Sequence, residues 1–200
     1  MRRIAIVSML LLAALAAAAR AESIEVLDAS LRASEDGLVL DADFEFELTP
    51  RLAEVVANGV PLYFRVEFQL TRPRWYWFNE KAAASHLQLR LSYHALSRQY
   101  RLSTGLLHQS FATLDEALNV LKRVRNWLVV DRTVRFGDAD YQAALRMRLD
   151  TALLPKPFQM SALLNRDLQL GGTWRRFTVR LPRQLPPPAE SREAKAEEPR

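Results

Sequence analysis

Hydrophobic and polar residues alternate with a period of two along most of this chain, as they do in β-strands that bury one face. The clearest run covers residues 38–48, where apolar side chains alternate with a row of acids. A second alternating run covers residues 24–33. The sequence Ser-Glu-Asp-Gly at 34–37 separates the two runs, and its glycine accommodates a positive φ. The pattern therefore predicts an antiparallel hairpin in this part of the chain.

The same alternation continues through much of the remaining sequence. It predicts further strands, which cover residues 62–71, 87–94, 100–104, 141–149 and 177–181. Between these runs lie segments rich in turn residues, or segments whose apolar positions recur every three to four residues. We expect short helices in the latter.

Two of these helices are predicted from their N-terminal capping residues. Thr49 is followed by a proline, a favoured first helical residue. Thr113 and Glu116 have the spacing of a capping box, and an apolar stripe continues from there to Val124. A weaker helical pattern covers residues 158–168. All three segments are short, so we expect them to connect strands rather than to form a layer of their own.

The strand pattern determines the expected fold class. Seven or eight mostly antiparallel strands that are apolar on one face need a second apolar layer, and two or three short connecting helices are too few to supply it. We therefore predict a mainly β protein, an antiparallel two-sheet β-sandwich. A doubly covered parallel sheet is excluded, because its strands would be apolar on both faces.

The N-terminal segment predicts where the protein functions. Arg2 and Arg3 precede an uncharged apolar run over residues 4–18, and Ala-Arg-Ala at 19–21 has the form of a signal peptidase site. The run has about fifteen residues, fewer than the roughly twenty that span a bilayer. We expect residues 1–21 to be a cleaved signal peptide and the mature protein to be a soluble periplasmic protein without an integral membrane segment.

Composition narrows this picture further. The chain has no cysteine, so it forms no disulfide and carries no lipid-modified cysteine after the signal. Residues 22–182 fit one domain, and residues 183–200, rich in Pro, Glu and Arg, are expected to form a disordered tail. The net charge of +5 falls to +2 once the signal peptide and the tail are left out. The body is therefore nearly neutral, which does not favour nucleic acid as a partner.

The most concentrated acidic feature is a row on one face of the second predicted strand. It consists of Asp41, Asp43, Glu45 and Glu47. Four carboxylates could bind calcium or supply an acid and a base, but a strand presents them in a diverging row, whereas calcium ligands converge. Arginines occupy outward positions on other predicted strands, so we expect cross-strand ion pairs instead. These arginines are Arg65, Arg90, Arg101, Arg146 and Arg148.

The sequence contains no recognisable catalytic or cofactor motif. His86, His94 and His108 show no metal-ligand spacing on any single predicted element. There is no nucleophile elbow, no zinc-protease motif and no glycine-rich phosphate loop. We therefore expect a protein that is not an enzyme, with no catalytic residue, no cofactor and no metal site.

The most distinctive segment is aromatic and basic. It consists of Arg74, Trp75, Tyr76, Trp77 and Phe78. Its aromatic side chains fall on both faces of an extended chain, so the outer ones are either covered by the protein's own helices or exposed. Trp, Tyr and Arg are enriched at protein interaction hot spots, and this segment is our candidate partner-binding surface.

Three motifs resemble a family of secreted proteobacterial proteins known as DUF4390. They lie at residues 72–81, 91–102 and 111–118. The resemblance covers almost the whole mature body and implies no activity, cofactor or catalytic residue. It implies a role beside a nitrogen-regulation-type two-component system, with the periplasmic region of the sensor histidine kinase as the partner.

Two functions therefore stand as expectations from the sequence. The first is a non-catalytic periplasmic protein that binds a partner protein through residues 74–78. The second is a carrier or sensor of a small apolar ligand held between the two sheets. The oligomeric state does not follow from the sequence.

Overall fold

The computed structural model describes residues 23–73, 80–137 and 139–181 of the chain. The strands in this part are β1 (Ser23–Ala33), β2 (Gly37–Glu45), β3 (Leu62–Arg72), β4 (Glu80–His94), β5 (Gln99–Thr104), β6 (Leu107–Phe111), β7 (Arg123–Asp131), β8 (Asp140–Leu149), β9 (Gly171–Gly172) and β10 (Arg175–Arg180). The α-helices are α2 (Pro50–Ala57), α3 (Leu114–Leu121) and α4 (Lys156–Leu164), and two 3₁₀ turns are η1 (Thr151–Leu153) and η2 (Arg166–Leu168). The prediction of a mainly β protein with short connecting helices is confirmed. None of the helices in these residues is long and apolar enough to cross a membrane.

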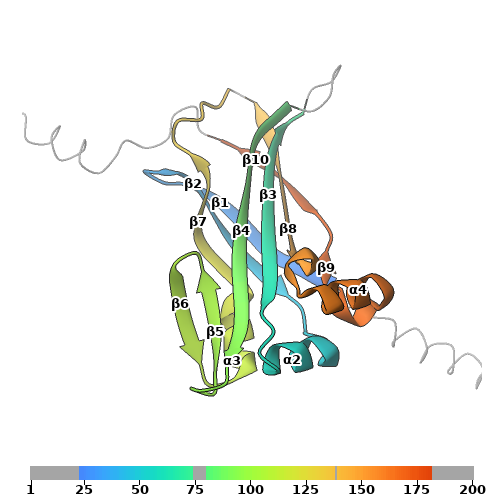
Figure 1. Ribbon diagram of the computed structural model, residues 1–200. Coiled ribbons are helices and arrows are strands. Elements are labelled where there is room, and N and C mark those ends of the chain that lie inside the picture. Colours follow the sequence, from blue (N-terminus) through green and yellow to red (C-terminus); the bar gives the residue numbers. More distant parts are fainter. Residues whose placement is uncertain (1–22, 74–79, 138, 182–200) are drawn as a thin grey trace, which may run out of the picture.

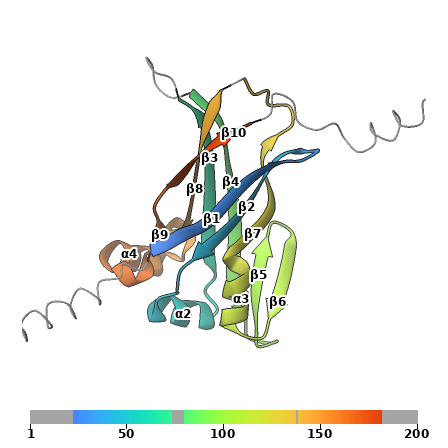
Figure 2. The same ribbon diagram turned by 180° about the vertical axis from the view of Figure 1, so that it is seen from behind.

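The strands form one curled sheet, which corrects the prediction of two separate sheets. Their order is β6-β5-β4-β3-β8-β9-β1-β2-β7, and β10 pairs with β8 outside this path. Among the residues described, all strand pairings are antiparallel except that of β1 with β9. In Figure 1, β3, β4 and β8 stand upright while β1 and β2 cross behind them, and Figure 2 shows the same crossing from the other side. The two layers of the expected sandwich are thus two parts of a single sheet.

The two-residue strand β9 joins these parts. Gly171 and Gly172 pair in parallel with Ser23 and Ile24 of β1, and Gly171 also pairs with Arg148 of β8. A Cβ atom at Gly172 would lie 2.6 Å from the carbonyl oxygens of both Ile24 and Met147, so only glycine fits between the two strands. Two residues carry no periodicity, which is why the sequence pattern did not predict the joint.

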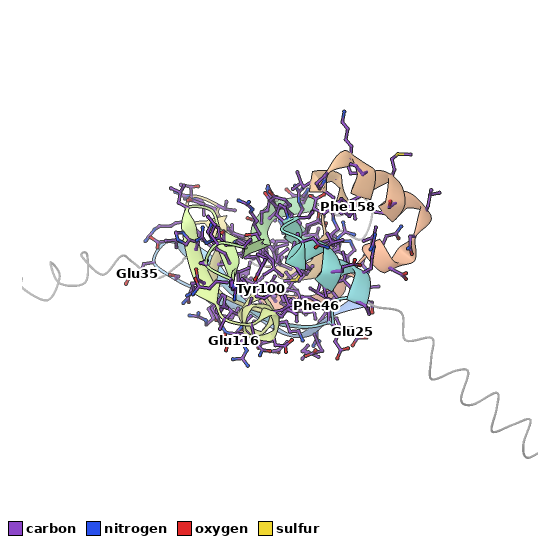
Figure 3. All side chains as sticks on the ribbon, turned by 60° about the horizontal axis from the view of Figure 1, so that its bottom comes forward. Glu25, Glu35, Phe46, Tyr100, Glu116 and Phe158 are labelled. Carbon is purple, nitrogen blue, oxygen red and sulfur yellow. The ribbon has the colours of Figure 1, made fainter. Side chains whose placement is uncertain are left out.

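The core lies inside the curl of the sheet. Alternate residues of β2, β3 and β8 point inward, as the period-two pattern predicts. The rings of Phe46 and Phe64, which come from the two crossing layers, are 5.6 Å apart. Figure 3 shows Phe46 in the interior and Glu25 at the periphery. The helix α2 buries Leu52, Val55 and Val56 against one end of the curl.

The second helix was predicted too long, and the strand after it was missed. The structure confirms the N-cap, where Thr113 Oγ1 accepts a hydrogen bond from the Glu116 N–H at 3.2 Å. The helix α3 ends at Leu121, however, and Val124 belongs to β7. Asn126 has a φ of 50° and the pairing of β7 with β2 shifts register around it. This irregularity is a β-bulge, and it interrupts the alternation of apolar and polar residues in β7. Val124, which lies before the bulge, has the spacing of the apolar stripe of α3, and the sequence pattern therefore assigned it to the helix.

Candidate functional site

The candidate partner-binding segment joins β3 to β4. Its members, Arg74, Trp75, Tyr76, Trp77 and Phe78, lie outside the described residues, as do the expected signal peptide and tail. The structure therefore does not test these predictions. Another candidate site lies among the residues that the structure describes.

The three acids of the row that lie on β2 form ion pairs, as expected, but with other partners than those predicted. Asp41 contacts Arg32 of β1 at 2.7 Å, and Asp43 contacts Arg125 of β7 at 2.5 Å. Glu45 contacts the Lys122 Nζ at 2.7 Å. The strand β2 lies between β1 and β7, far along the sheet order from the strands that carry the five predicted arginines. The prediction of the partners was wrong because a sequence pattern gives the face of a residue and not its neighbouring strand.

Three of those five arginines pair with acids on their own part of the sheet. Arg146 and Arg148 on β8 both contact the Glu67 carboxylate on β3. Arg65 lies 3.2 Å from Asp150, a buried acid that follows β8. These charges compensate one another. Arg90 and Arg101 have no such ion pair among the described residues.

Two carboxyl groups of these networks have lowered pKa values. The Asn126 backbone N–H, 2.8 Å from Asp41 Oδ1, and the Arg32 guanidinium hold the pKa of Asp41 below its ordinary value. Burial raises the pKa of Glu67, but the hydrogen bonds and charges of Arg146 and Arg148 outweigh it and lower the pKa. Both carboxyls therefore bind a proton less readily in the folded than in the unfolded chain.

We expect acid to destabilise the protein for this reason. The stabilisation is complete above the unfolded-state pKa values, about 4, and is lost as the pH falls through the lowered folded-state values. Urea unfolding should show a falling free energy of unfolding from pH 5 to pH 3. Asp41→Asn should cost about 1 kcal/mol at pH 7 and flatten this fall. Glu47→Gln, an exposed position of the same row, is the charge-matched control, and an equal effect of both changes would contradict the account.

Arg90 and Arg101 lie in a groove on the outer face of β4, β5 and β6. This outer groove has a volume of about 790 Å³. Its basic and imidazole side chains are His86, Arg90, His94, Arg101 and His108. No aspartate or glutamate is among the residues that line it. The groove thus gathers Arg90, Arg101 and all three histidines of the chain, and no acid is among its lining residues.

Strand register places a serine at the centre of this groove. Ser103 of β5 lies opposite Arg90 of β4 on one side and opposite His108 of β6 on the other. Arg101 precedes it by two residues and faces the same way, about 7–8 Å from Arg90 between Cα atoms. Tyr63 of β3 lies opposite Arg90, whose guanidinium is 6.0 Å from the ring centroid. Two guanidinium groups, a hydroxyl and an imidazole therefore surround one point of the sheet surface.

Arg101 also lacks a partner for a buried donor. Its Nε atom is buried and makes no hydrogen bond within the described residues. An unsatisfied buried donor costs about 1–3 kcal/mol. Oxygen atoms of an anion are suitable acceptors for such a donor, because guanidinium groups bind carboxylates and phosphates through paired N–H groups.

His94 contributes a donor to the groove. Its Nδ1 atom accepts a hydrogen bond from the Ser97 backbone N–H at 3.3 Å and lies 2.9 Å from the Ser97 hydroxyl. The neutral ring therefore carries its proton on Nε2, which is left to donate. Among the described residues no three His, Cys, Asp or Glu side chains are placed to hold a metal ion together.

The comparison with known families agrees with the sequence motifs. A family described as "Domain of unknown function (DUF4390)" matches residues 21–178. The chain belongs to the DUF4390 family. No curated protein and no solved structure matches it. The family resemblance of the motifs at residues 72–81, 91–102 and 111–118 is thereby confirmed, and the DUF4390 match covers nearly all of the described strands.

This DUF4390 protein has a second, apolar pocket on the inner side of the same strands. The inner pocket has a volume of about 400 Å³ and lies between β4–β6, α3 and β7. Its apolar walls are Leu87, Leu89, Leu102, Leu107, Val120, Leu121 and Val124, and Arg123 and Arg125 also line it. The inner pocket and the outer groove share Leu87, Leu107 and His108.

Sequence reasoning missed the outer groove of the DUF4390 domain because it depends on register. The three histidines share no spacing on any single predicted element, and β6, which carries His108, was not predicted as a strand. The sequence does contain one indication of the groove. Arg90 and Arg101 occupy outward positions, and no acid lies between residues 81 and 114. The stretch is basic and the hairpin 24–48 is acidic, and a sign asymmetry of this kind can mark a binding face or can be neutralised between neighbouring strands.

Proposed function

We propose that this protein is a non-catalytic, exported binding protein whose outer groove binds an anionic group of its ligand or partner. The observation that carries the proposal is the lining of the groove, which contains two arginines and three histidines, no acid, and a buried Arg101 Nε without a partner. A concave site with a few convergent polar groups is the usual form of a binding site. The arrangement offers donors and positive charge, and no carboxylate among the lining residues orients an imidazole as a base.

The proposed partner is the periplasmic region of a nitrogen-regulation-type sensor histidine kinase, as the family resemblance implies. In this proposal the groove receives carboxylates of the partner, and the aromatic segment 74–78 supplies the apolar contact. Charge complementarity of this kind sets orientation and association rate more than affinity. The location in the periplasm is part of the same proposal.

Titration calorimetry with pyrophosphate tests the groove directly. We expect binding that weakens at least tenfold in Arg101→Gln and in Arg90→Gln, because a hydrogen bond to a charged group contributes about 1.5–3 kcal/mol. Arg176→Gln removes the same charge from an exposed position on β10 and should leave binding unchanged. Equal weakening in all three variants would indicate a general charge effect and would contradict a specific site.

A carrier of a small apolar ligand is the second candidate function. The inner pocket favours it, since most of its walls are apolar and its volume is about 400 Å³. Native mass spectrometry of protein purified without detergent should then show bound ligand mass. Val120→Trp, at a half-exposed wall position of the pocket, should remove that mass, whereas ligand retained unchanged in this variant would place it elsewhere.

A further inference from the structure

The sheet has two ends, and they differ in how they are protected. The described strand order ends at β6 on one side and at β7 on the other. β7 carries Arg123, Arg125 and Asp131, and the bulge at Asn126 twists it. Charges and bulges are the usual means of preventing strand addition at an edge. The end at β6, at the lower left of Figure 1, has neither.

The strand β6 has the features of an open edge. Its sequence, Leu-His-Gln-Ser-Phe, contains no proline and no acidic or basic residue other than a histidine. Its first four residues are exposed, and Leu107 and the preceding Leu106 have 79% and 101% of their surfaces accessible. Among the described residues only β5 pairs with it. An exposed, uncharged edge of this kind is a template for a further strand.

The hairpin register shows which backbone groups are available. Thr104 and Leu107 pair across the two-residue turn that contains Gly105, which has a φ of 58°. Residues that flank such a turn exchange both hydrogen bonds, and along an antiparallel ladder bonded and non-bonded pairs alternate. The pairs of His108 with Ser103 and of Ser110 with Arg101 are therefore non-bonded. The N–H and C=O groups of His108 and Ser110 point away from β5, toward the free edge.

We propose that β6 receives an extended acidic segment of a partner protein as an additional strand, whose acidic side chains lie over the outer groove. The inference rests on the proposed anion binding and adds the backbone contact that would position the anions. An added strand lies about 4.8 Å beyond β6. Its side chains next to Ser110 and His108 share a face with Arg101 and Ser103, which are directly opposite on β5.

Charge argues for an acidic partner rather than a second copy of this chain. Pairing β6 with itself would bring two grooves lined by Arg90, Arg101 and three histidines toward each other. Like charges across an interface disfavour association, whereas carboxylates of an added strand would supply acceptors for the buried Arg101 Nε. Main-chain hydrogen bonds would supply affinity, and the groove would supply selectivity for acids.

Fluorescence anisotropy with a labelled, blocked peptide of four Glu-Val repeats tests the inference on the full chain. We expect the peptide to bind, and the matching Lys-Val peptide to bind at least tenfold more weakly. Ser110→Pro removes one outward N–H without breaking the ladder to β5 and should weaken binding at least tenfold. Ser110→Ala keeps that N–H and should bind like the native protein. The melting temperature of each variant, measured beside binding, shows whether the hairpin has been kept.

The outcomes separate this inference from the anion site. If Arg101→Gln weakens peptide binding while a folded Ser110→Pro does not, the groove binds anions without strand addition and the inference is wrong. If pyrophosphate binds but the acidic peptide does not, the inference is also wrong while the proposed function stands. If light scattering shows a dimer and Ser110→Pro dissociates it, the β6 edge binds a second copy of this chain. The inference of an added acidic strand is then wrong. Failure of both ligands would overturn the two proposals together.

Discussion

Phe64→Ala is expected to lower the free energy of unfolding by about 3–5 kcal/mol. Phe64 is fully buried on β3, a central strand with β4 on one side and β8 on the other. Its ring packs against Phe46, which lies beyond the end of β2 in the crossing layer. Truncation removes this contact and leaves a cavity between the two layers of the curl. The loss should therefore exceed the transfer free energy of the missing atoms alone.

Urea unfolding followed by tryptophan fluorescence measures this change. Leu106→Ala is the matched control, because Leu106 is fully exposed at the turn between β5 and β6 and should change stability by less than about 0.5 kcal/mol. A loss below 1 kcal/mol for Phe64→Ala would mean that the two layers do not pack on each other at this position. That result would contradict the curled sheet.

Gly172→Ala is expected to destabilise the protein by about 1–3 kcal/mol through overpacking. The added methyl group would lie 2.6 Å from the backbone oxygens of Ile24 and Met147, which belong to strands on either side of β9. Since neither oxygen is at the end of a flexible side chain, β1 and β8 must move apart. Calorimetric unfolding should show a lower melting temperature.

The neighbouring glycine provides an unusually close control. A Cβ atom at Gly171 has nothing within 4 Å, so Gly171→Ala should be nearly neutral. Equal melting temperatures for the two variants would show that β1 and β8 are not joined through β9. A separate pair of sheets, as the sequence pattern predicts, would then describe the protein better.

The sequence predicts the strands of this fold well where one face is buried without interruption. In β3 every second residue from Leu62 to Leu70 is buried, so the alternation is complete and its two ends are clear. The helix α2 is predicted equally well, since the Thr49 side chain accepts from the Leu52 N–H as an N-cap should. Local physical chemistry determines both features.

Features that depend on pairing could not be predicted in this way. In β7 the alternation of apolar and polar residues is interrupted at Asn126. The strand β9 has only two residues, Gly171 and Gly172, and is too short to show an alternation. The outward positions of Arg90 and Arg101 are visible in the sequence, but their distance from His108 depends on the registers of β4 with β5 and of β5 with β6. The candidate site is therefore a property of the sheet and not of any single motif.

Nuclear magnetic resonance titration with pyrophosphate tests the central claim, that the outer groove binds an anionic group. In a ¹⁵N-labelled sample, the largest shift changes should fall on β4, β5 and β6 around Ser103 and should disappear in Arg101→Gln. Shift changes of similar size at the paired arginines of β8, or a pattern that Arg101→Gln leaves intact, would contradict the account.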